Sequence, residues 1–223
     1  EWYFAAQRAP VMPFSVLLEA ALQPCGWLAA YIGSALTSDV DLSFRNLGGK
    51  AVLHQPVGPR IGTLTTTVRI TRVSQSAGMI IQHYDFAVRN AGRDVYTGNT
   101  YFGFFSKEAL ANQVGLREFE LLAKPDSDQS SLWTGEYPRS EPYPDDMLRM
   151  VDRVTWLDIR GGPKGLGAIE GRIRVDPDAW FFKAHFFQDP VWPGSLGLES
   201  FLQLARLLAE RCWNRPIGPL AIP

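Results

Sequence analysis

The sequence has few of the residues that mark a metal, disulfide-rich or redox protein. Among 223 residues there are two cysteines and three histidines. His54 and His83 lie in strand-like segments without ligand spacing, so we assign them to structure and expect no metal site. Cys25 and Cys212 each lie in an apolar, helix-like context, which favours buried free thiols in a reducing compartment over a disulfide. The cytoplasm is therefore the expected location.

Excess charge and long apolar runs are also missing. A formal net charge of -1 gives no electrostatic reason to expect nucleic acid or an anionic membrane as a partner. Charges or prolines interrupt every candidate for a membrane span of ~18 to 20 apolar residues. The first residues, Glu1 to Phe4, contain neither an initiator Met nor a basic signal-peptide region, so we expect the chain to be part of a longer protein.

The composition is that of an ordinary globular protein, with 46% hydrophobic and 12% aromatic residues. At this length it fits one large domain or two small ones. An aromatic, strand-like run from Trp180 leads to His185. A turn with Asp-Pro, Trp-Pro and Gly194 follows, and a largely apolar helix begins at Ser195 and contains Glu199.

This stretch has an echo near the N-terminus. A shift of 180 positions superposes Pro10 on Pro190, Val11 on Val191, Pro13 on Pro193, Ser15 on Ser195, Leu18 on Leu198, Glu19 on Glu199, Leu22 on Leu202 and Gln23 on Gln203. The histidine has no equivalent in the echo, because Ala5 is the ungapped counterpart of His185. The chain is therefore interpreted as an imperfect duplication, with each copy built on one long helix.

The first copy is predicted to consist of a buried helix and an antiparallel meander. Residues 14–36 are apolar on every face, which predicts a helix that is buried all round, kinked or interrupted at Pro24. Glu19 is the only charged residue in that segment, and an unpaired buried carboxylate is costly. Residues 37–50 are predicted to form a loop.

Segments rich in β-branched and aromatic residues predict the strands of the meander. They are 51–57, 63–74, 78–89 and 94–105, with a hairpin turn at 90–93.

The domain boundaries follow from these patterns. Residues 1–106 are predicted to form the first copy, 107–145 a polar, proline-rich linker that contains a short helix near 107–116, and 146–223 the second copy. Within the second copy, 147–159 and 168–175 are strand-like and precede the helix. Copy one thus lacks the strands before its helix, and copy two lacks those after it, so either they lie outside this sequence or another chain supplies them.

The segment from His185 to Glu199 resembles the signature of the hot-dog-fold β-hydroxyacyl-carrier-protein dehydratases, nearest the β-hydroxydecanoyl thioester dehydratase branch. That signature has a His on the strand before the central helix, an Asp-Pro-Val-x-Pro-Gly turn, and an acidic residue fourteen positions after the His, as 199 minus 185 gives here. The first copy is similar to the dehydratase regions of polyunsaturated fatty acid synthases through Leu18 to Leu28 and the later Gly98-x-x-x-Phe102-Gly-Phe-Phe. The resemblance implies an α+β double hot-dog fold, with antiparallel sheet wrapped around two long central helices.

The resemblance also implies a chemistry and a set of site residues. In such dehydratases the His of one hot-dog acts with the acid of its partner, which pairs His185 with Glu19 and leaves Glu199 and Gln203 in a vestigial second site. Gly194 and Ser195 are expected to supply backbone N–H groups for the thioester oxygen.

Two further residues are expected to hold these groups in place. Val191 C=O is expected to fix the His185 tautomer, and Gln23 to hydrogen-bond Glu19 one helical turn away. No cofactor is expected beyond substrate carried on the phosphopantetheine of an acyl carrier protein. That carrier and other synthase domains are the implied partners, with a homodimer as a further option.

Several alternatives stay open on the sequence alone. In the alternative interpretation, His185 is a core histidine, Glu19 is a structural carboxylate and Ser195 is a helix cap. Isomerisation of the double bond is in doubt because the isomerising branch usually has Asp where this chain has Glu. A non-catalytic hot-dog module of a megasynthase and a hot-dog acyl thioesterase are the competing functions.

Overall fold

The computed structural model describes residues 2–76, 78–112, 132–186 and 189–213. The chain divides into two compact units, which are described separately below. Of the described residues, one unit holds 2–15 together with 132–213, and the other holds 16–112. The N-terminal segment thus belongs with the second copy of the repeat.

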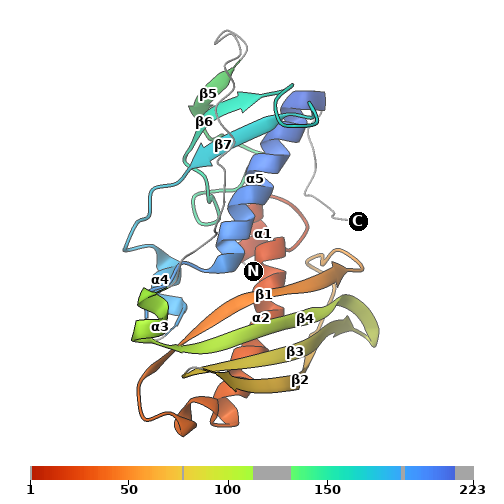
Figure 1. The fold of residues 1–223 in the computed structure, drawn as a ribbon. Helices are drawn as coiled ribbons and strands as arrows, with labels where there is room; N and C mark the ends of the chain where they lie inside the picture. Colours follow the sequence, from red (N-terminus) through yellow and green to blue (C-terminus); the bar gives the residue numbers. More distant parts are fainter. Residues whose placement is uncertain (1, 77, 113–131, 187–188, 214–223) are drawn as a thin grey trace. The chain divides into compact units, whose positions relative to one another are not determined.

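The unit formed by residues 16–112 contains a four-stranded antiparallel sheet (Figure 1). The strands β1 (Leu42–Leu53), β2 (Leu64–Ser76), β3 (Met79–Asn90) and β4 (Arg93–Ser106) lie in the order β1-β4-β3-β2. Strands β3 and β4 form the predicted hairpin, whose turn has positive φ at Ala91 (46°) and Gly92 (80°). Such angles are those of a tight type I′ connection.

Helix α2 (Phe14–Tyr31) packs on this sheet with small residues. Cys25 and Ala29 form a core with sheet residues from β3 and β4. The sheet side of this core consists of Ile80, Tyr84, Phe102 and Phe104. The helix continues through Pro24, and the kink or lost hydrogen bond expected at that residue stays a prediction. A short 3₁₀ turn, η1 (Ser34–Thr37), follows, and α3 (Lys107–Ala111) comes after β4 with Ser106 Oγ accepting from Ala109 N at 3.2 Å.

The other unit contains a three-stranded antiparallel sheet and the long helix α5 (Gly194–Trp213). Strands β5 (Trp133–Glu136), β6 (Arg153–Asp158) and β7 (Ala168–Arg172) lie in the order β5-β6-β7. Helix α5 contacts β7 closely, because a Cβ at Gly171 would lie 2.7 Å from Leu204 Cδ2. The core between helix and sheet consists of Tyr137, Val151, Val154, Leu157 and Leu207.

Two short helices pack in a second core of this unit. Helices α1 (Trp2–Gln7) and α4 (Trp180–Ala184) contribute Ala6 and Phe181. These side chains pack with Leu148, Met150 and Leu196. The indole rings of Trp2 and Trp180 also meet edge to face at 5.2 Å. The first residue of each helix is therefore in contact with the first residue of the other.

Several expectations about the elements were wrong. The aromatic run before His185 is the helix α4 and not a strand, because its backbone turns at the Trp-Phe-Phe-Lys-Ala segment and His185 N donates to Phe181 O at 2.8 Å. The predicted loop 37–50 contains the first nine residues of β1, which pair with β4. Helix α2 is not buried all round, since Trp27 and Tyr31 stack on each other at its exposed side.

The segment predicted as a linker also contains regular structure. Within its described part, β5 pairs with β6, and the ring of Tyr137 is buried in the core under α5. The expected strand 147–159 is regular only over β6, and the residues before it run as turn and extended chain that carry Leu148 and Met150 into the core. None of the described helices has both the length and the apolar character needed to cross a membrane.

Candidate active site

His185 is held immediately after the last residue of α4. Its backbone lies in the extended region (φ -101°, ψ 123°), and the next residue, Phe186, has positive φ (44°). The imidazole Nδ1 lies 2.8 Å from Val191 O. A carbonyl can only accept, so this contact places the N–H of a neutral ring on Nδ1 and leaves Nε2 with its lone pair.

The turn after His185 is anchored by an aromatic contact. The ring of Trp192 packs against that of Phe181 at 4.6 Å, which ties the turn to α4. Helix α5 then begins at Gly194, an exposed residue at which a Cβ would meet no atom within 4 Å. Ser195, in contrast, is buried. In the first turn of α5, Gly194 is thus exposed and Ser195 is buried.

Glu199 is a buried carboxyl whose two oxygens are both engaged. Gln203 Nε2 donates to Glu199 Oε1 at 3.0 Å, and Ser15 Oγ donates to Oε2 at 3.0 Å. Desolvation raises the pKa of this carboxyl above its ordinary value, and the hydrogen bonds from Gln203 and Ser15 and the charge of Arg206 oppose that rise. A serine from the start of the first-copy helix is therefore paired with the carboxyl of the second-copy helix.

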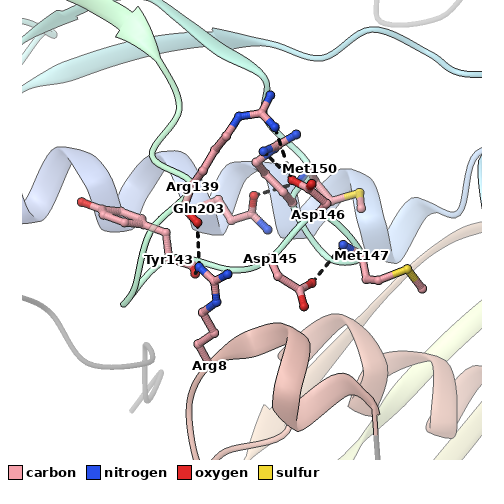
Figure 2. Close-up of polar contacts among 9 residues, drawn as sticks. Arg8, Arg139, Tyr143, Asp145, Asp146, Met147, Met150 and Gln203 are labelled. Atoms are coloured by element: carbon pink, nitrogen blue, oxygen red, sulfur yellow. Dashed lines mark hydrogen bonds and ion pairs between the residues drawn. The ribbon is translucent and has the colours of Figure 1, made fainter.

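Gln203 links Glu199 to the chain segment beneath α5. Its Nε2 also donates to Leu148 O at 2.8 Å. Its Oε1 accepts from Met150 N at 2.9 Å (Figure 2). The backbone of Gln203 accepts from Tyr137 Oη at 3.3 Å. The side chain thus uses both of its polar atoms in the protein interior, which suits a structural role for this pair.

The same segment holds the N-terminal helix. Asp145 N donates to Ala6 O at 2.8 Å. Arg8 Nη1 donates to Arg139 O at 2.7 Å and to Tyr143 O at 3.2 Å (Figure 2). Residues on either side of Gln7 are therefore fixed to the 139–145 segment. The buried Oε1 of Gln7 itself has no hydrogen-bond partner among the described residues.

Gln7, and not Ala5, is the structural counterpart of His185. With a shift of 178 positions, Trp2-Tyr-Phe-Ala-Ala-Gln7 aligns with Trp180-Phe-Phe-Lys-Ala-His185. Each of these helices ends at or just before that last residue, and each is followed by a non-glycine residue with positive φ, Arg8 (53°) in one case and Phe186 in the other. Ala5 lies inside α1, so the ungapped comparison missed a difference of two residues between Gln7 and Pro10.

Glu19 and Gln23 lie on α2, in the unit of residues 16–112. Gln23 Nε2 donates to Glu19 Oε2 at 3.2 Å, the contact that the spacing of four residues predicts. Glu19 is partly buried and Gln23 is exposed, whereas their counterparts Glu199 and Gln203 are both buried. The pairing of Glu19 with His185 stays a prediction.

Polar residues that the sequence did not single out continue the row on α5. Arg206 donates to Glu210 at 3.2 Å, and Tyr143 Oη donates to Glu210 Oε2. The spacing 199, 203, 206 and 210 is that of one helical face, which was the available signal. For Ser15 the signal was its alignment with Ser195.

The remaining histidines and cysteines have local contacts. His54 Nε2 lies 2.8 Å from Thr97 Oγ1, and the His83 ring stacks on Tyr101 at 5.4 Å. Cys25 and Cys212 are both free, and burial raises the pKa of Cys25 to about 12. No group of three or more potential metal ligands occurs among the residues that the structure describes.

A family model described as a FabA-like domain matches residues 1–99 and 143–215. The chain belongs to the FabA-like domain family. The matched ranges include α2, α5 and His185. The 100–142 region, which includes most of the segment predicted as a linker, lies outside the match.

The chain also resembles part of a much longer protein, a polyunsaturated fatty acid synthase component from Thraustochytrium sp.. The two are 30% identical over 231 residues, an alignment that covers 93% of this chain and 15% of that relative. The chain thus spans only a small part of the relative's length.

Two solved structures show weaker likeness. A probable thioesterase from Bartonella henselae aligns at 15% identity over 45% of this chain and 82% of its own, with a TM-score of 0.38. A SecB-like chaperone of Mycobacterium tuberculosis aligns at 20% identity over 33% and 59%, with a TM-score of 0.24. At these TM-scores neither likeness bears on the function.

Proposed function

We propose that this chain is a dehydratase region of a polyunsaturated fatty acid or polyketide-type synthase and that it converts β-hydroxyacyl thioesters of an acyl carrier protein to enoyl thioesters. Membership of the FabA-like family and the likeness to part of a fatty acid synthase support the reaction class. The geometry of His185 supports the role of base, because Val191 O holds the ring with Nε2 unprotonated. The chain is proposed to form a double hot-dog.

His185 Nε2 removes the α-proton of the substrate. The electron pair moves onto the thioester oxygen, where backbone N–H groups at Gly194 and Ser195 stabilise the enolate-like charge. Collapse of that charge forms the Cα=Cβ bond and expels the β-hydroxyl, to which Glu19 gives a proton so that water leaves. The proton on His185 then returns to Glu19, and no net proton is consumed.

The observation that carries the assignment of Glu19 is the hydrogen bond between Ser15 and Glu199. It joins the beginning of the first-copy helix to the acid of the second copy, within one compact unit that also holds Gln7 and His185. Under the repeat, Ser15 corresponds to Ser195, Gln7 to His185 and Glu199 to Glu19. The same exchange between copies supports Glu19 as the acid for His185, with Gln23 and Ser195 as positioning residues.

Purified protein with a β-hydroxyacyl pantetheine thioester tests this function. We expect reversible hydration and dehydration, followed by absorbance of the conjugated enoyl thioester, with loss of about a hundredfold or more in kcat/KM for His185→Ala. His54→Ala is the matched control, because His54 is exposed and its ring contacts Thr97 on the first-copy sheet.

Each competing function predicts a different result. Activity that survives in His185→Ala contradicts the mechanism, and release of free thiol from an acyl thioester indicates a thioesterase. Wild-type protein that binds the thioester without converting it indicates a non-catalytic module. Chromatography of the products shows whether isomerisation of the double bond accompanies dehydration.

A further inference from the structure

The first-copy counterpart of the histidine segment keeps its aromatic helix and its turn, but it has Gln7 in place of the histidine and two residues fewer before the first proline. Helix α1 repeats the aromatic sequence of α4, its equivalent tryptophan contacts that of α4, and a residue with positive φ ends both. Both are followed by a Pro-x-x-Pro turn and a long helix. Gln7 thus occupies, at the end of α1, the place that His185 occupies after α4.

Gln7 is held in place on both sides. Ala6 is buried against Leu148 and Met150, and the Arg8 guanidinium donates to carbonyls of the 139–143 segment. Leu148 and Met150 are also the residues whose backbone groups bond to Gln203, the partner of Glu199. Gln7 and Glu199 therefore approach the same short segment from α1 and α5.

The side-chain oxygen of Gln7 lacks a hydrogen-bond donor among the described residues. This atom, Oε1, is buried. A buried acceptor without a partner costs about 1–3 kcal/mol, so such an atom indicates a missing donor. Arg149 Nε, a buried donor between Leu148 and Met150, also has no hydrogen-bond partner among the described residues. The donors of Ser15 and Gln203 are already committed to Glu199 and cannot be that partner.

We propose that the site around Gln7 and Glu199 binds a β-hydroxyacyl pantetheine thioester without dehydrating it, as a holding site separate from the catalytic one. The proposal rests on the proposed function, since it takes its ligand class from there. The β-hydroxyl of such a ligand donates to Gln7 Oε1. A carboxamide is not a base near neutral pH, so the bound thioester keeps its α-proton and its hydroxyl.

The test counts ligands bound to the whole chain. The probe is a 3-hydroxyhexanoyl pantetheine analogue with an amide in place of the thioester, which removes the acidity that dehydration needs. Isothermal titration and native mass spectrometry are expected to give two equivalents for the wild type and one for Gln7→Leu. Gln75→Leu, an exposed glutamine on β2, is the matched control and is expected to retain two.

A measurement on the unaltered protein covers the case in which Gln7→Leu does not fold. Titration of the probe is expected to shift the side-chain amide resonance of Gln7 in a ¹H–¹⁵N spectrum. A wild type that binds one equivalent with no shift at Gln7 overturns the proposal. The dehydration assay is independent of this count, so a wild type that dehydrates but binds one equivalent refutes the holding site and leaves the proposed function standing.

Discussion

Helices α2 and α5 carry the same sequence pattern 180 residues apart, but different faces of the two helices are buried. Ala21 is fully buried on α2, whereas its counterpart Phe201 is 68% exposed on α5. In the opposite sense, Leu207 is fully buried on α5, whereas its counterpart Trp27 is 65% exposed on α2. The two helices thus contact their sheets with different sides.

The difference follows from which strands lie beside each helix. The sheet that packs on α2 comes after it in the chain, and the sheet that packs on α5 comes before it. The buried positions of α5 include Glu199, Gln203 and Leu207, whereas the matching positions of α2 are Glu19, Gln23 and Trp27. Glu199 and Gln203 are therefore buried and hydrogen-bonded to each other inside α5's unit, whereas their counterparts Glu19 and Gln23 are more exposed.

The largest expected effect is a difference in dehydration activity between substitutions of Glu19 and of Glu199. Glu19→Gln is predicted to lower kcat/KM for dehydration by about a hundredfold or more, because an amide cannot protonate the leaving hydroxyl. Glu199→Gln is predicted to lower it less than tenfold, since that carboxyl is engaged by Ser15 and Gln203. Glu108→Gln, on the short helix α3, is the exposed control. The reverse order of the two effects would assign the acid to the same copy as His185.

The second prediction concerns the two apolar positions. Leu207→Ala is expected to lower the free energy of unfolding by about 2–5 kcal/mol, because it opens a cavity between α5 and the sheet. Trp27→Ala is expected to change it by less than about 0.5 kcal/mol, because that ring contacts mainly Tyr31 at the surface. Urea unfolding followed by far-UV circular dichroism measures both. Equal losses would show that the exposed face of α2 is covered in solution.

The sequence predicted the elements that depend on local pattern. The hairpin at 90–93, the two long helices and the four strands of the first copy follow from turn residues and β-branched segments. It failed where a segment takes its conformation from tertiary contacts. The run Trp180 to Ala184 has high strand propensity, but it packs as a helix because Phe181 enters the core with Ala6 and Leu196.

The candidate site was predictable in its residue types and not in its details. The His-to-Glu spacing identified His185 and Glu199, and the echo identified Glu19. Gln7 was missed because an ungapped shift cannot show a two-residue difference, which became visible only when α1 and α4 proved to be equivalent helices. Helix α2 was expected to be buried all round because composition cannot say which face a sheet covers.

The third prediction compares the two glutamines. Gln203→Leu is expected to destabilise the chain by about 2–3 kcal/mol, because it leaves Met150 N, Leu148 O and Glu199 without their side-chain partner. Gln23→Leu is expected to be neutral within about 0.5 kcal/mol, because Gln23 is exposed. Hydrogen exchange of the Met150 amide provides a local readout, and it should accelerate only in Gln203→Leu. Unchanged protection there would mean that the backbone and not the side chain holds this segment.

The smallest expected effect is a pH dependence of stability at Glu199. Burial raises the pKa of Glu199 above its ordinary value of 4.5, so the folded state binds this proton more tightly than the unfolded state. The resulting contribution is fully present below about pH 4.5 and is lost as the pH rises through the folded pKa. The size of that loss grows with the pKa difference between the folded and unfolded states.

Urea unfolding of the wild type and Glu199→Gln between pH 4 and 8 measures this contribution. The difference in free energy of unfolding between the two proteins should change with pH above 4.5 and favour Glu199→Gln progressively as the wild-type carboxyl ionises. Glu108→Gln should run parallel to the wild type over the whole range, because its carboxyl is exposed. Parallel curves for Glu199→Gln as well would mean that the hydrogen bonds from Ser15 and Gln203, with the Arg206 charge, compensate for desolvation. Glu199 would then be ionised in the folded chain, and the difference between the two copies would lie in the accessibility of the carboxyls and not in their proton affinity.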